Sequence, residues 1–597
     1  MIPFNLKTAV EVFVGANSFA RASSYVRMNS HLHRQHNAGN YQSIHSGKYS
    51  TLRSLRVALV ALLSLSFALH SPSGSARAET TAKVGENIYL HGVLGSGQPL
   101  EALRDDGLRI AGADAACVNC HRRSGFGSKE GRISIPPVTG RYLFHQRAPS
   151  VEDLDLPYVE SMRADREPYS DETLAKAIRE GFGSEGKPLS YLMPHFALND
   201  ADMAALTEYL KHLDKRNLPG VTDTVLHFAT IITPDADPVE RQGMLAVLNQ
   251  FFADKNVFPL GPTPRVRSSH KEMYMVNRRW ELHVWQLTGA AATWQTQLEQ
   301  HFEREPVLAV VSGLGGKNWA PVHAFCEHNA VPCLFPNVEA PPANADHDFY
   351  SLYFSKGVEL EAGLIANRIL NPDSGEVAKV VHQIYRTGDN GEIAAKTLAA
   401  ALERQGVTVR SSILPAGAPG KGVAKALRKS STADALVLWL RPADVAALGR
   451  VQSAPPVVFM SGLMGGLERS PLPQNWREHV HLAYPFALQD QRRVNVDYAF
   501  GWFAIRHIPV VAEQVQADTF LACGLLAETL KHMVDTFVPD YLVERMEDSI
   551  DHRIVTGYYP RLSLGSGQRF ASKGGYIVHF ADSGGTKLVA DGIWIVP

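Results

Sequence analysis

The sequence predicts a multidomain protein in which a small all-α domain precedes a larger α/β domain. Three observations support this prediction. At 597 residues, the chain is too long for a single hydrophobic core. Capped helical patterns surround a Cys-x-x-Cys-His motif in the first quarter after the leader. From Val225 onward, apolar runs alternate with amphipathic helical patterns, an order typical of a parallel sheet covered on both faces.

The first 78 residues have the layout of a secretory leader. They hold eight Lys or Arg residues and one acidic residue. Two arginines precede an apolar run over Val57–Leu69, and Ala76, Arg77 and Ala78 then match an A-x-A cleavage pattern. The run is shorter than the roughly 20 apolar residues of a membrane span, although an uncleaved anchor is the alternative interpretation. Because the signal lies far from the first residue, we expect a later true start, with Met28 as one candidate.

The charge of the chain argues against a nucleic-acid partner. The full sequence has a net charge of −1, and without the leader it keeps 51 basic and 59 acidic residues. A mildly acidic chain has no basic patch for a phosphate backbone. We therefore expect an exported, periplasmic protein that meets a membrane only if the leader is retained.

The motif Cys117-Val-Asn-Cys120-His121 is the attachment signature of a c-type haem. Its two thiols add to two vinyl groups on one haem edge, and the following histidine is held under the iron as proximal ligand. A thioredoxin-like redox pair would not need His121, and a zinc site would need a second ligand pair at suitable spacing. The sequence therefore predicts one covalently attached haem.

Capped helices flank this motif. Tyr169–Gly181 reads as a capped helix closed by glycine, and Gly85–Tyr89 reads as part of an N-terminal helix. Asn199 or Asp200 is a natural N-cap for a further helix, whose apolar stripe includes Met203 and Leu206. Met193, followed by Pro194, lies on the loop that leads into this helix.

Residues 79–216 resemble class I cytochrome c. The resemblance implies that Met193 is the distal haem ligand and that the N-terminal and C-terminal helices pack on each other. The alternatives are an ordinary core methionine, or His195 or His145 as distal ligand. Residues 92–113 depart from the family, and we expect them to form an inserted surface loop or hairpin. Methionine–histidine ligation closes the iron to small ligands and favours electron transfer.

After a polar linker at residues 217–222, the remainder of the chain, residues 223–597, reads as an α/β domain. Buried strands are predicted at Val225–Ile232, Val307–Val311, Val331–Phe335, Val377–Ile384, Ala435–Leu440 and Val457–Met460. Amphipathic helices are predicted at Glu240–Phe252, Glu392–Gln405 and Thr519–Thr536.

The order of these elements resembles a type I periplasmic binding protein of the leucine or branched-chain amino acid receptors of ABC transporters. That resemblance implies two lobes joined by crossing strands, with a ligand cleft at the carboxyl ends of the strands. The candidate cleft residues are Ser312, Gly313, Gly315, Glu339, Tyr385 and Asp389. The glycines are equally compatible with a plain strand-to-helix turn.

Glu339 departs from the amino-acid receptors, which place small hydroxyl residues in this position. Its carboxylate would repel an anionic ligand, so we expect a neutral or cationic ligand, or none. Cys326 and Cys333 flank a helix-to-strand step and form a possible disulfide in an oxidising compartment, with two buried thiols as the alternative. Cys523 lies in an apolar helix and reads as a core residue.

Three functions follow from these features. The first is a monohaem electron carrier that serves a redox partner, such as a periplasmic dehydrogenase or another cytochrome, and is coupled to a receptor-like domain. The second is an ABC-transporter-type substrate-binding protein that carries its haem as an accessory sensor. The third is a haem enzyme, although the sequence has one C-x-x-C-H where two-haem peroxidases need two. The sequence thus favours a carrier over a catalyst and identifies no catalytic residue.

Overall fold

A computed structural model describes residues 73–130, 133–144, 166–213, 218–257, 261–267, 272–343, 345–373, 375–450, 457–533, 536–565, 567–582 and 584–597. The apolar run Val57–Leu69, Met28 and His145 lie outside the described residues, as does part of the predicted linker. None of the helices in the described ranges is long and apolar enough to cross a membrane.

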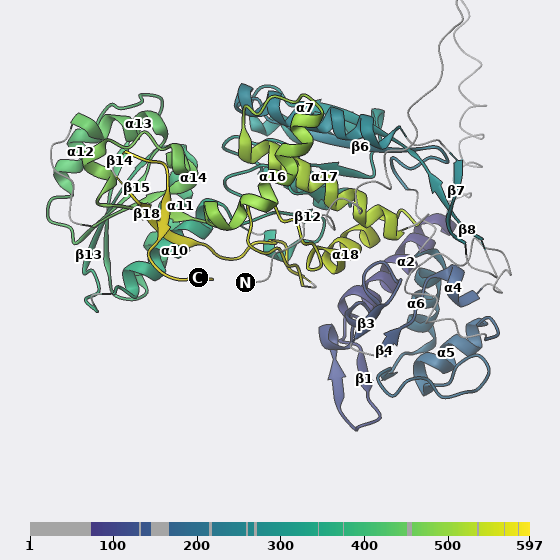
Figure 1. Ribbon diagram of the computed structural model, residues 1–597. Helices are drawn as coiled ribbons and strands as arrows, with labels where there is room; N and C mark the ends of the chain where they lie inside the picture. The colour runs from purple at the N-terminus through teal and green to yellow at the C-terminus, as the bar shows by residue number, and fades with distance from the viewer. Residues whose placement is uncertain are drawn as a thin grey trace, which may run out of the picture. The chain divides into compact units, whose positions relative to one another are not determined.

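The first domain is framed by two crossing helices, α2 (Ser73–His91) and α6 (Asp200–His212) (Figure 1). A Cβ atom on Gly85 would lie 2.2 Å from the carbonyl oxygen of Ala205, so only glycine allows this close crossing. The rings of Tyr89 and Tyr209 pack at 5.3 Å beside it. The predicted packing of the N-terminal helix on the C-terminal helix is therefore confirmed.

Helices α5 and α6 of this domain begin where the sequence signals predict. Helix α5 (Asp171–Glu180) has a capping box at Ser170 and ends at Gly181, whose φ is 75°. In α6 the side chain of Asn199 accepts a hydrogen bond from the backbone N–H of Asp202. The remaining helices are the short α3 (Val118–His121) and α4 (Gly140–Phe144).

The expectation that this domain is all-α is wrong. The insertion at residues 92–113 forms the hairpin β1 (Glu101–Leu103) and β2 (Arg109–Ala111), as one of the two predicted alternatives. Strand β5 (His195–Phe196) adds to the free edge of β1, because that edge offers unpaired backbone groups to the loop after Met193. A second hairpin joins β3 (Ser128–Glu130) to β4 (Ile133–Ile135).

The α/β region contains two separate sheets. The first has the order β12-β11-β10-β6-β9, and all its pairings are parallel. Its strands are β6 (Val225–Ile232), β9 (Arg279–Gln286), β10 (Ala309–Val311), β11 (Cys333–Leu334) and β12 (Ser351–Leu352). Helices α7 (Pro238–Lys255), α8 (Trp294–Arg304) and α9 (Ala320–His328) connect them, and the hairpin β7 (Gly261–Arg267) and β8 (Glu272–Asn277) forms a separate ribbon.

The second sheet has the order β14-β13-β15-β16-β17-β18-β19. Its first five strands in that order are parallel, and the last two are antiparallel. The strands are β13 (Val380–Arg386), β14 (Thr408–Leu414), β15 (Ala435–Trp439), β16 (Val458–Ser461), β17 (Val480–Tyr484), β18 (Tyr576–Phe580) and β19 (Leu588–Ala590). The helices are α10 (Val358–Leu370), α11 (Asn390–Glu403), α12 (Val423–Lys429), α13 (Pro442–Ala446), α14 (Gly462–Gly465) and α15 (Gln474–Arg477).

The chain crosses between the two sheets three times, which gives the predicted two lobes. It leaves the first lobe after β12, returns after β17, and leaves again to form β18. The returning helices are α16 (Gln489–Ile505), α17 (Glu513–Met533) and α18 (Pro539–Ile550). Helix α17 packs on α7 of the first lobe, and Figure 1 shows these two segments side by side although they lie far apart in the sequence.

Candidate functional site

The predicted haem-attachment residues share one helical turn. Cys117 is the N-cap of α3, and the backbone N–H of His121 donates to the carbonyl oxygen of Cys117 at 2.9 Å. Residues three and four positions apart lie on one face of a helix. Cys117, Cys120 and His121 therefore lie together on this turn, the arrangement that a thioether-linked haem requires.

The ring of His121 is buried and oriented by a backbone carbonyl. Its Nδ1 lies 2.9 Å from the carbonyl oxygen of Pro136. Because a carbonyl can only accept, Nδ1 carries the proton and Nε2 presents a lone pair. Burial lowers the pKa of His121, although the bond to Pro136 opposes this shift. A buried, neutral and oriented imidazole fits the role of proximal iron ligand.

The backbone after His121 turns sharply. Arg122 has a φ of 64°, and its carbonyl oxygen accepts a hydrogen bond from the buried hydroxyl of Tyr89 at 2.7 Å. A Cβ atom on Gly127 would lie 2.1 Å from the carbonyl oxygen of Ile135. This turn brings the segment with Pro136 back against the His121 ring, since the N–H of Gly127 donates to the carbonyl oxygen of His121.

Met193 lies half-buried against the core of the first domain, the same cluster that Cys117 and Val118 contact. His195, the alternative distal ligand, lies on β5 at the surface, with Nε2 3.4 Å from a carboxylate oxygen of Asp105. A Cβ atom on Gly181 would touch that ring. His195 is thus paired with Asp105 of the β1–β2 hairpin and packs against Gly181. The role of Met193 as distal ligand stays a prediction.

The sequence of this domain matches a known family. Residues 105–214 match the family model described as cytochrome c. This part of the chain is a cytochrome c domain. The family implies haem c as cofactor, and the geometry of Cys117, Cys120 and His121 fits that group.

The comparison with curated proteins found no match. Among solved structures, the chain is similar to a leucine-binding protein from Thermotoga maritima, at 12% identity and a TM-score of 0.45, covering 62% of this chain and 99% of that one. It is also similar to a possible leucine/isoleucine/valine-binding protein from Rhodopirellula baltica, at 14% identity and a TM-score of 0.47, covering 63% and 98%. A fatty acid ABC transporter substrate-binding protein from Thermomonospora curvata has 14% identity and a TM-score of 0.45, covering 64% and 95%.

Three of the predicted cleft residues have packing roles in the first lobe. The Ser312 hydroxyl is buried, lies 3.0 Å from the Thr519 hydroxyl, and accepts a hydrogen bond from Asn337 at 2.9 Å. Cβ atoms on Gly313 and Gly315 would lie 3.0 and 2.6 Å from the ring of Trp319. Gly313 and Gly315 therefore leave room for the Trp319 ring at a strand-to-helix turn. This is the alternative to ligand binding that the sequence analysis left open.

Two other predicted residues, Glu339 and Asp389, come together around a residue that the sequence analysis missed. Arg441 donates from its two terminal nitrogens to the two oxygens of Glu339, at 2.6 Å each, and also to Asp389 at 2.8 Å. Asn390 donates to Glu339 at 2.8 Å. Glu339 follows β11 of the first lobe, and Asp389 and Arg441 follow β13 and β15 of the second. Tyr385, by contrast, is buried in the core of the second lobe.

The electrostatics of this cluster favour an ionised Asp389. Burial would raise the pKa of Asp389, but hydrogen bonds from Arg441 outweigh it and hold the pKa below its ordinary value. At nearby Glu240, burial and repulsion from Asp237 and Glu339 outweigh the attraction of Arg441 and raise the pKa to about 7. Arg441 therefore offsets one of the two carboxylate charges of Glu339 and Asp389, and the net negative charge that remains disfavours an anionic ligand.

Arg441 could have been found from the sequence. It directly follows the predicted strand Ala435–Leu440, and the carboxyl ends of parallel strands meet at one edge of a sheet.

Cys326 and Cys333 are both buried free thiols in the structure. Burial raises the pKa of Cys326 well above its ordinary value, and a hydrogen bond with Cys333 adds to this shift. The disulfide between them stays a prediction.

The residues directly after His121 bond to helix α18 of the first lobe. Arg122 donates to Glu547 at 3.0 Å and to Asp548 at 2.7 Å, and Arg123 donates to Asp540 at 2.9 Å. We call these contacts the α18 contact, and the name also covers the Ser124–Glu544 hydrogen bonds and the Phe126–Tyr541 packing described next. Local sequence patterns do not indicate this contact, because its partners lie more than 400 residues apart.

The centre of the α18 contact is buried. The backbone N–H of Ser124 donates to Glu544 at 2.9 Å, and the Ser124 hydroxyl also donates to that carboxylate. Burial raises the pKa of Glu544 to about 8, and repulsion from Asp540 adds to this shift. The rings of Phe126 and Tyr541 pack at 4.7 Å beside it. A buried carboxylate with two hydrogen bonds fixes the haem-attachment segment on α18.

Proposed function

We propose that this chain is an exported, periplasmic electron-transfer protein coupled to a solute- or partner-binding domain. It carries one haem c, attached covalently through Cys117 and Cys120, with His121 and Met193 as axial ligands. The haem supplies reversible one-electron transfer when bound. The partner that gives or takes this electron is a periplasmic dehydrogenase or another cytochrome.

The residues of the chain support this role in three ways. The turn of α3 presents both thiols to one haem edge, and Pro136 orients the His121 ring with Nε2 as the ligand atom. Met193 is half-buried against the core that Cys117 also packs on, which supports its assignment as the distal ligand. A haem held by these residues would supply electron transfer instead of substrate binding.

The observation that carries the coupling is the α18 contact. Glu547 accepts from Arg122 through one oxygen and from Arg569 through the other, at 3.0 and 2.7 Å. Arg569 lies on the third crossing between the lobes, where its carbonyl oxygen accepts from the N–H of Tyr353 on the first crossing. A change in the relative position of the lobes would therefore be transmitted to Arg122, the neighbour of His121. It would pass through the ion pairs of Glu547 with Arg569 and with Arg122.

The haem ligation is tested by spectroscopy of the mature protein, produced with haem-maturation machinery. A pyridine haemochrome spectrum should show one thioether-linked haem. The oxidised protein should show the near-infrared thioether band of methionine ligation, which Met193→Ala should remove. Met203→Leu, which alters a buried methionine of helix α6, is the matched control and should keep the band. A high-spin spectrum or ready binding of carbon monoxide in the wild type would contradict a closed iron and favour a haem enzyme.

The coupling is tested through the midpoint potential. Glu547→Gln removes the charge that links Arg569 to Arg122, so the potential should shift from that of the wild type. Glu392→Gln changes a partly exposed carboxylate that is paired with Lys396 in the second lobe, and it should leave the potential unchanged. Equal potentials in all three proteins would mean that the two domains are only tethered.

The interlobe cluster of Glu339, Asp389 and Arg441 favours a second candidate function, an ABC-transporter-type substrate-binding protein with the haem as accessory sensor. Two carboxylates around one guanidinium leave a net negative charge, which suits a neutral or cationic ligand. Equilibrium binding of a solute library distinguishes the two functions. Tight binding that shifts the potential supports the coupled carrier, and tight binding without any shift supports the receptor.

A further inference from the structure

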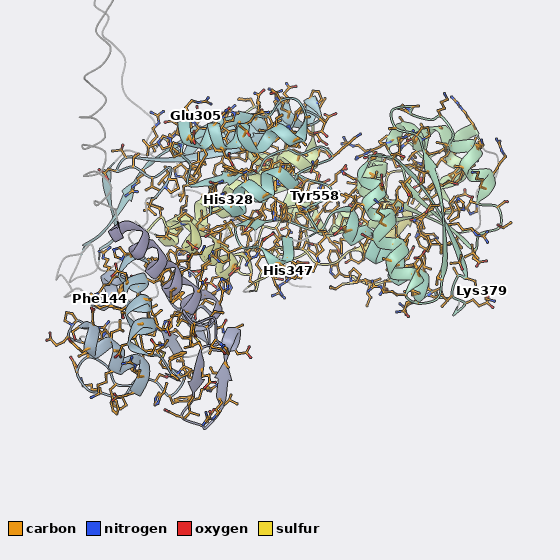
Figure 2. The ribbon with its side chains drawn as sticks, turned by 180° about the vertical axis from the view of Figure 1, so that it is seen from behind. Phe144, Glu305, His328, His347, Lys379 and Tyr558 are labelled. Carbon is orange, nitrogen blue, oxygen red and sulfur yellow. The ribbon has the colours of Figure 1, made fainter. Side chains whose placement is uncertain are left out.

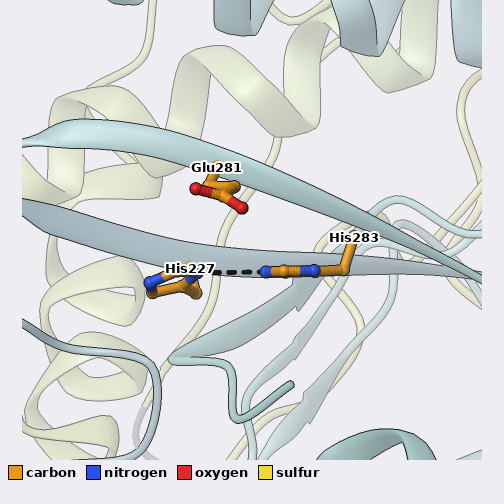
Figure 3. Close-up of side chains that lie close together, drawn as sticks. All are labelled: His227, Glu281 and His283. Atoms are coloured by element: carbon orange, nitrogen blue, oxygen red, sulfur yellow. Dashed lines mark hydrogen bonds between the residues drawn. The ribbon is translucent and has the colours of Figure 1, made fainter. Parts of the chain in front are cut away.

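A cluster of possible metal ligands lies on the first sheet, away from both the haem segment and the interlobe cluster. His227 on β6 is the register partner of Glu281 on β9, and His283 lies two residues further along β9. All three side chains therefore project from the same face of the sheet. Figure 3 shows them gathered across the two adjacent strands.

The ligand atoms of this cluster are close together. Nδ1 of His227 lies 3.0 Å from Nε2 of His283, and each residue offers one ligand atom within 4.8 Å of the other two. Two nitrogens bound at 2.0–2.1 Å to a tetrahedral zinc ion lie about 3.4 Å apart. The two imidazoles would therefore need to separate by only a few tenths of an ångström to hold a metal between them.

A second layer of contacts orients His283. Its other ring nitrogen, Nδ1, lies 3.4 Å from a carboxylate oxygen of Glu305, the residue after α8 (labelled in Figure 2). That oxygen also accepts from the indole N–H of Trp285 at 3.2 Å, and the second oxygen of Glu305 lies 3.4 Å from Arg304. A carboxylate behind a histidine fixes the tautomer that leaves Nε2 as ligand, the usual arrangement at histidine metal sites.

We propose that His227, Glu281 and His283 form a binding site for a divalent transition-metal ion of the zinc class, with Glu305 as a positioning residue. Two imidazoles and one carboxylate suit zinc, whereas calcium and magnesium prefer oxygen ligands alone. Three protein ligands leave the fourth tetrahedral position to water.

The site is separate from the interlobe cluster. His227 is the third residue of β6, so the site lies in the amino-terminal half of the strands, whereas Glu339 and Arg441 lie beyond the carboxyl ends. In the protein without metal, one imidazole donates its N–H to the other, as Figure 3 draws. Both rings are partly buried, which keeps competing water from most of the site.

The test measures zinc on the mature haem-loaded protein. After equilibrium dialysis against a zinc buffer, elemental analysis should find one tightly held zinc per chain, counted separately from haem iron. The double variant His227→Ala/His283→Ala should lose that zinc. Glu305→Gln should keep the site but weaken it by about 10–100-fold, the usual effect of removing a partner behind a metal-bound histidine.

Two controls make the result decisive. His328→Gln removes an exposed histidine at the end of α9 (labelled in Figure 2) and should bind zinc like the wild type. Circular dichroism of each variant checks folding, and Glu281→Gln provides a milder test if the double variant unfolds. The absence of bound zinc in the wild type, or equal zinc in wild type and folded ligand variants, would overturn the proposal. Anomalous scattering from a zinc-soaked crystal would locate the ion directly.

Discussion

Arg441 and Glu339 join the two lobes through a two-point ion pair, with both nitrogen-to-oxygen distances at 2.6 Å. The fork of a guanidinium matches a carboxylate, so this pair fixes orientation as well as distance. Asp389 shares the same guanidinium and belongs to the same lobe as Arg441. Glu339 lies in the first lobe, so its pair with Arg441 connects the two lobes.

Glu339→Ala should loosen the contact between the lobes. Because both partners are about one-third exposed, the unfolding free energy should fall by only about 1–2 kcal/mol, between the values for surface and buried pairs. Small-angle scattering should show a larger radius of gyration. Asp373→Asn breaks an exposed pair with Arg368 and should change neither quantity. An unchanged radius in Glu339→Ala would show that other contacts hold the lobes.

Gly85→Val should prevent the crossing of α2 and α6. The new Cβ atom would meet the Ala205 carbonyl at 2.2 Å and the Tyr209 Cβ at 2.7 Å, and neither is the end of a flexible side chain. We expect a loss of about 1–3 kcal/mol or more and a lower yield of haem-loaded protein. The matched control is Gly501→Ala in α16, where no atom lies within 4 Å. It should be neutral or stabilise by up to about 1 kcal/mol. Equal effects would mean that the crossing is not tight.

Glu361 should make the protein less stable as the pH rises. Its side chain is fully buried against Ser461 and the N–H of Leu463, and burial raises its pKa from the ordinary value of 4.5 to about 8. The folded protein therefore keeps a proton that the unfolded chain releases, so this contribution to stability is complete below about pH 4.5 and is lost as the pH rises to about 8.

Denaturant titrations at pH 5 and pH 9 measure this effect. Glu361→Gln removes the ionisable group, so its unfolding free energy should fall less between the two pH values than that of the wild type. Glu403→Gln, at the exposed end of α11, should behave like the wild type. The same fall in all three proteins would contradict the assigned shift.

In the exported protein that we propose, Cys326 and Cys333 should form a disulfide, because their buried thiols are hydrogen-bonded neighbours and that compartment is oxidising. Alkylation in denaturant should add one label, at Cys523, since the haem occupies Cys117 and Cys120. Reduction before alkylation should add two more labels. Three labels without reduction would show that the pair remains as thiols, as in the structure.

The sequence predicted most of the elements because their signals are local. The strand predicted at Val225–Ile232 has those bounds in the structure, and the helix predicted at Glu240–Phe252 lies inside α7. Strand β9 was missed because its burial pattern mixes exposed and buried residues, so neither alternation nor a continuous apolar run marks it. Helix α18 was missed because its buried residues include several carboxylates, so no apolar stripe marks its buried face. The partners of these carboxylates come from distant parts of the chain and meet them only in the folded protein.

The sequence by itself predicted the haem-attachment residues, because Cys117, Cys120 and His121 lie within five residues, a spacing that one helical turn brings together. It also determined the two-lobed class, because alternating strands and helices leave few ways to build a sheet. The tertiary structure decided which side chains meet. The pairing of Glu339 with Arg441, of Ser124 with Glu544 and of His227 with His283 joins residues 56 to 420 positions apart. Such contacts depend on strand order and helix packing, which local sequence patterns do not specify.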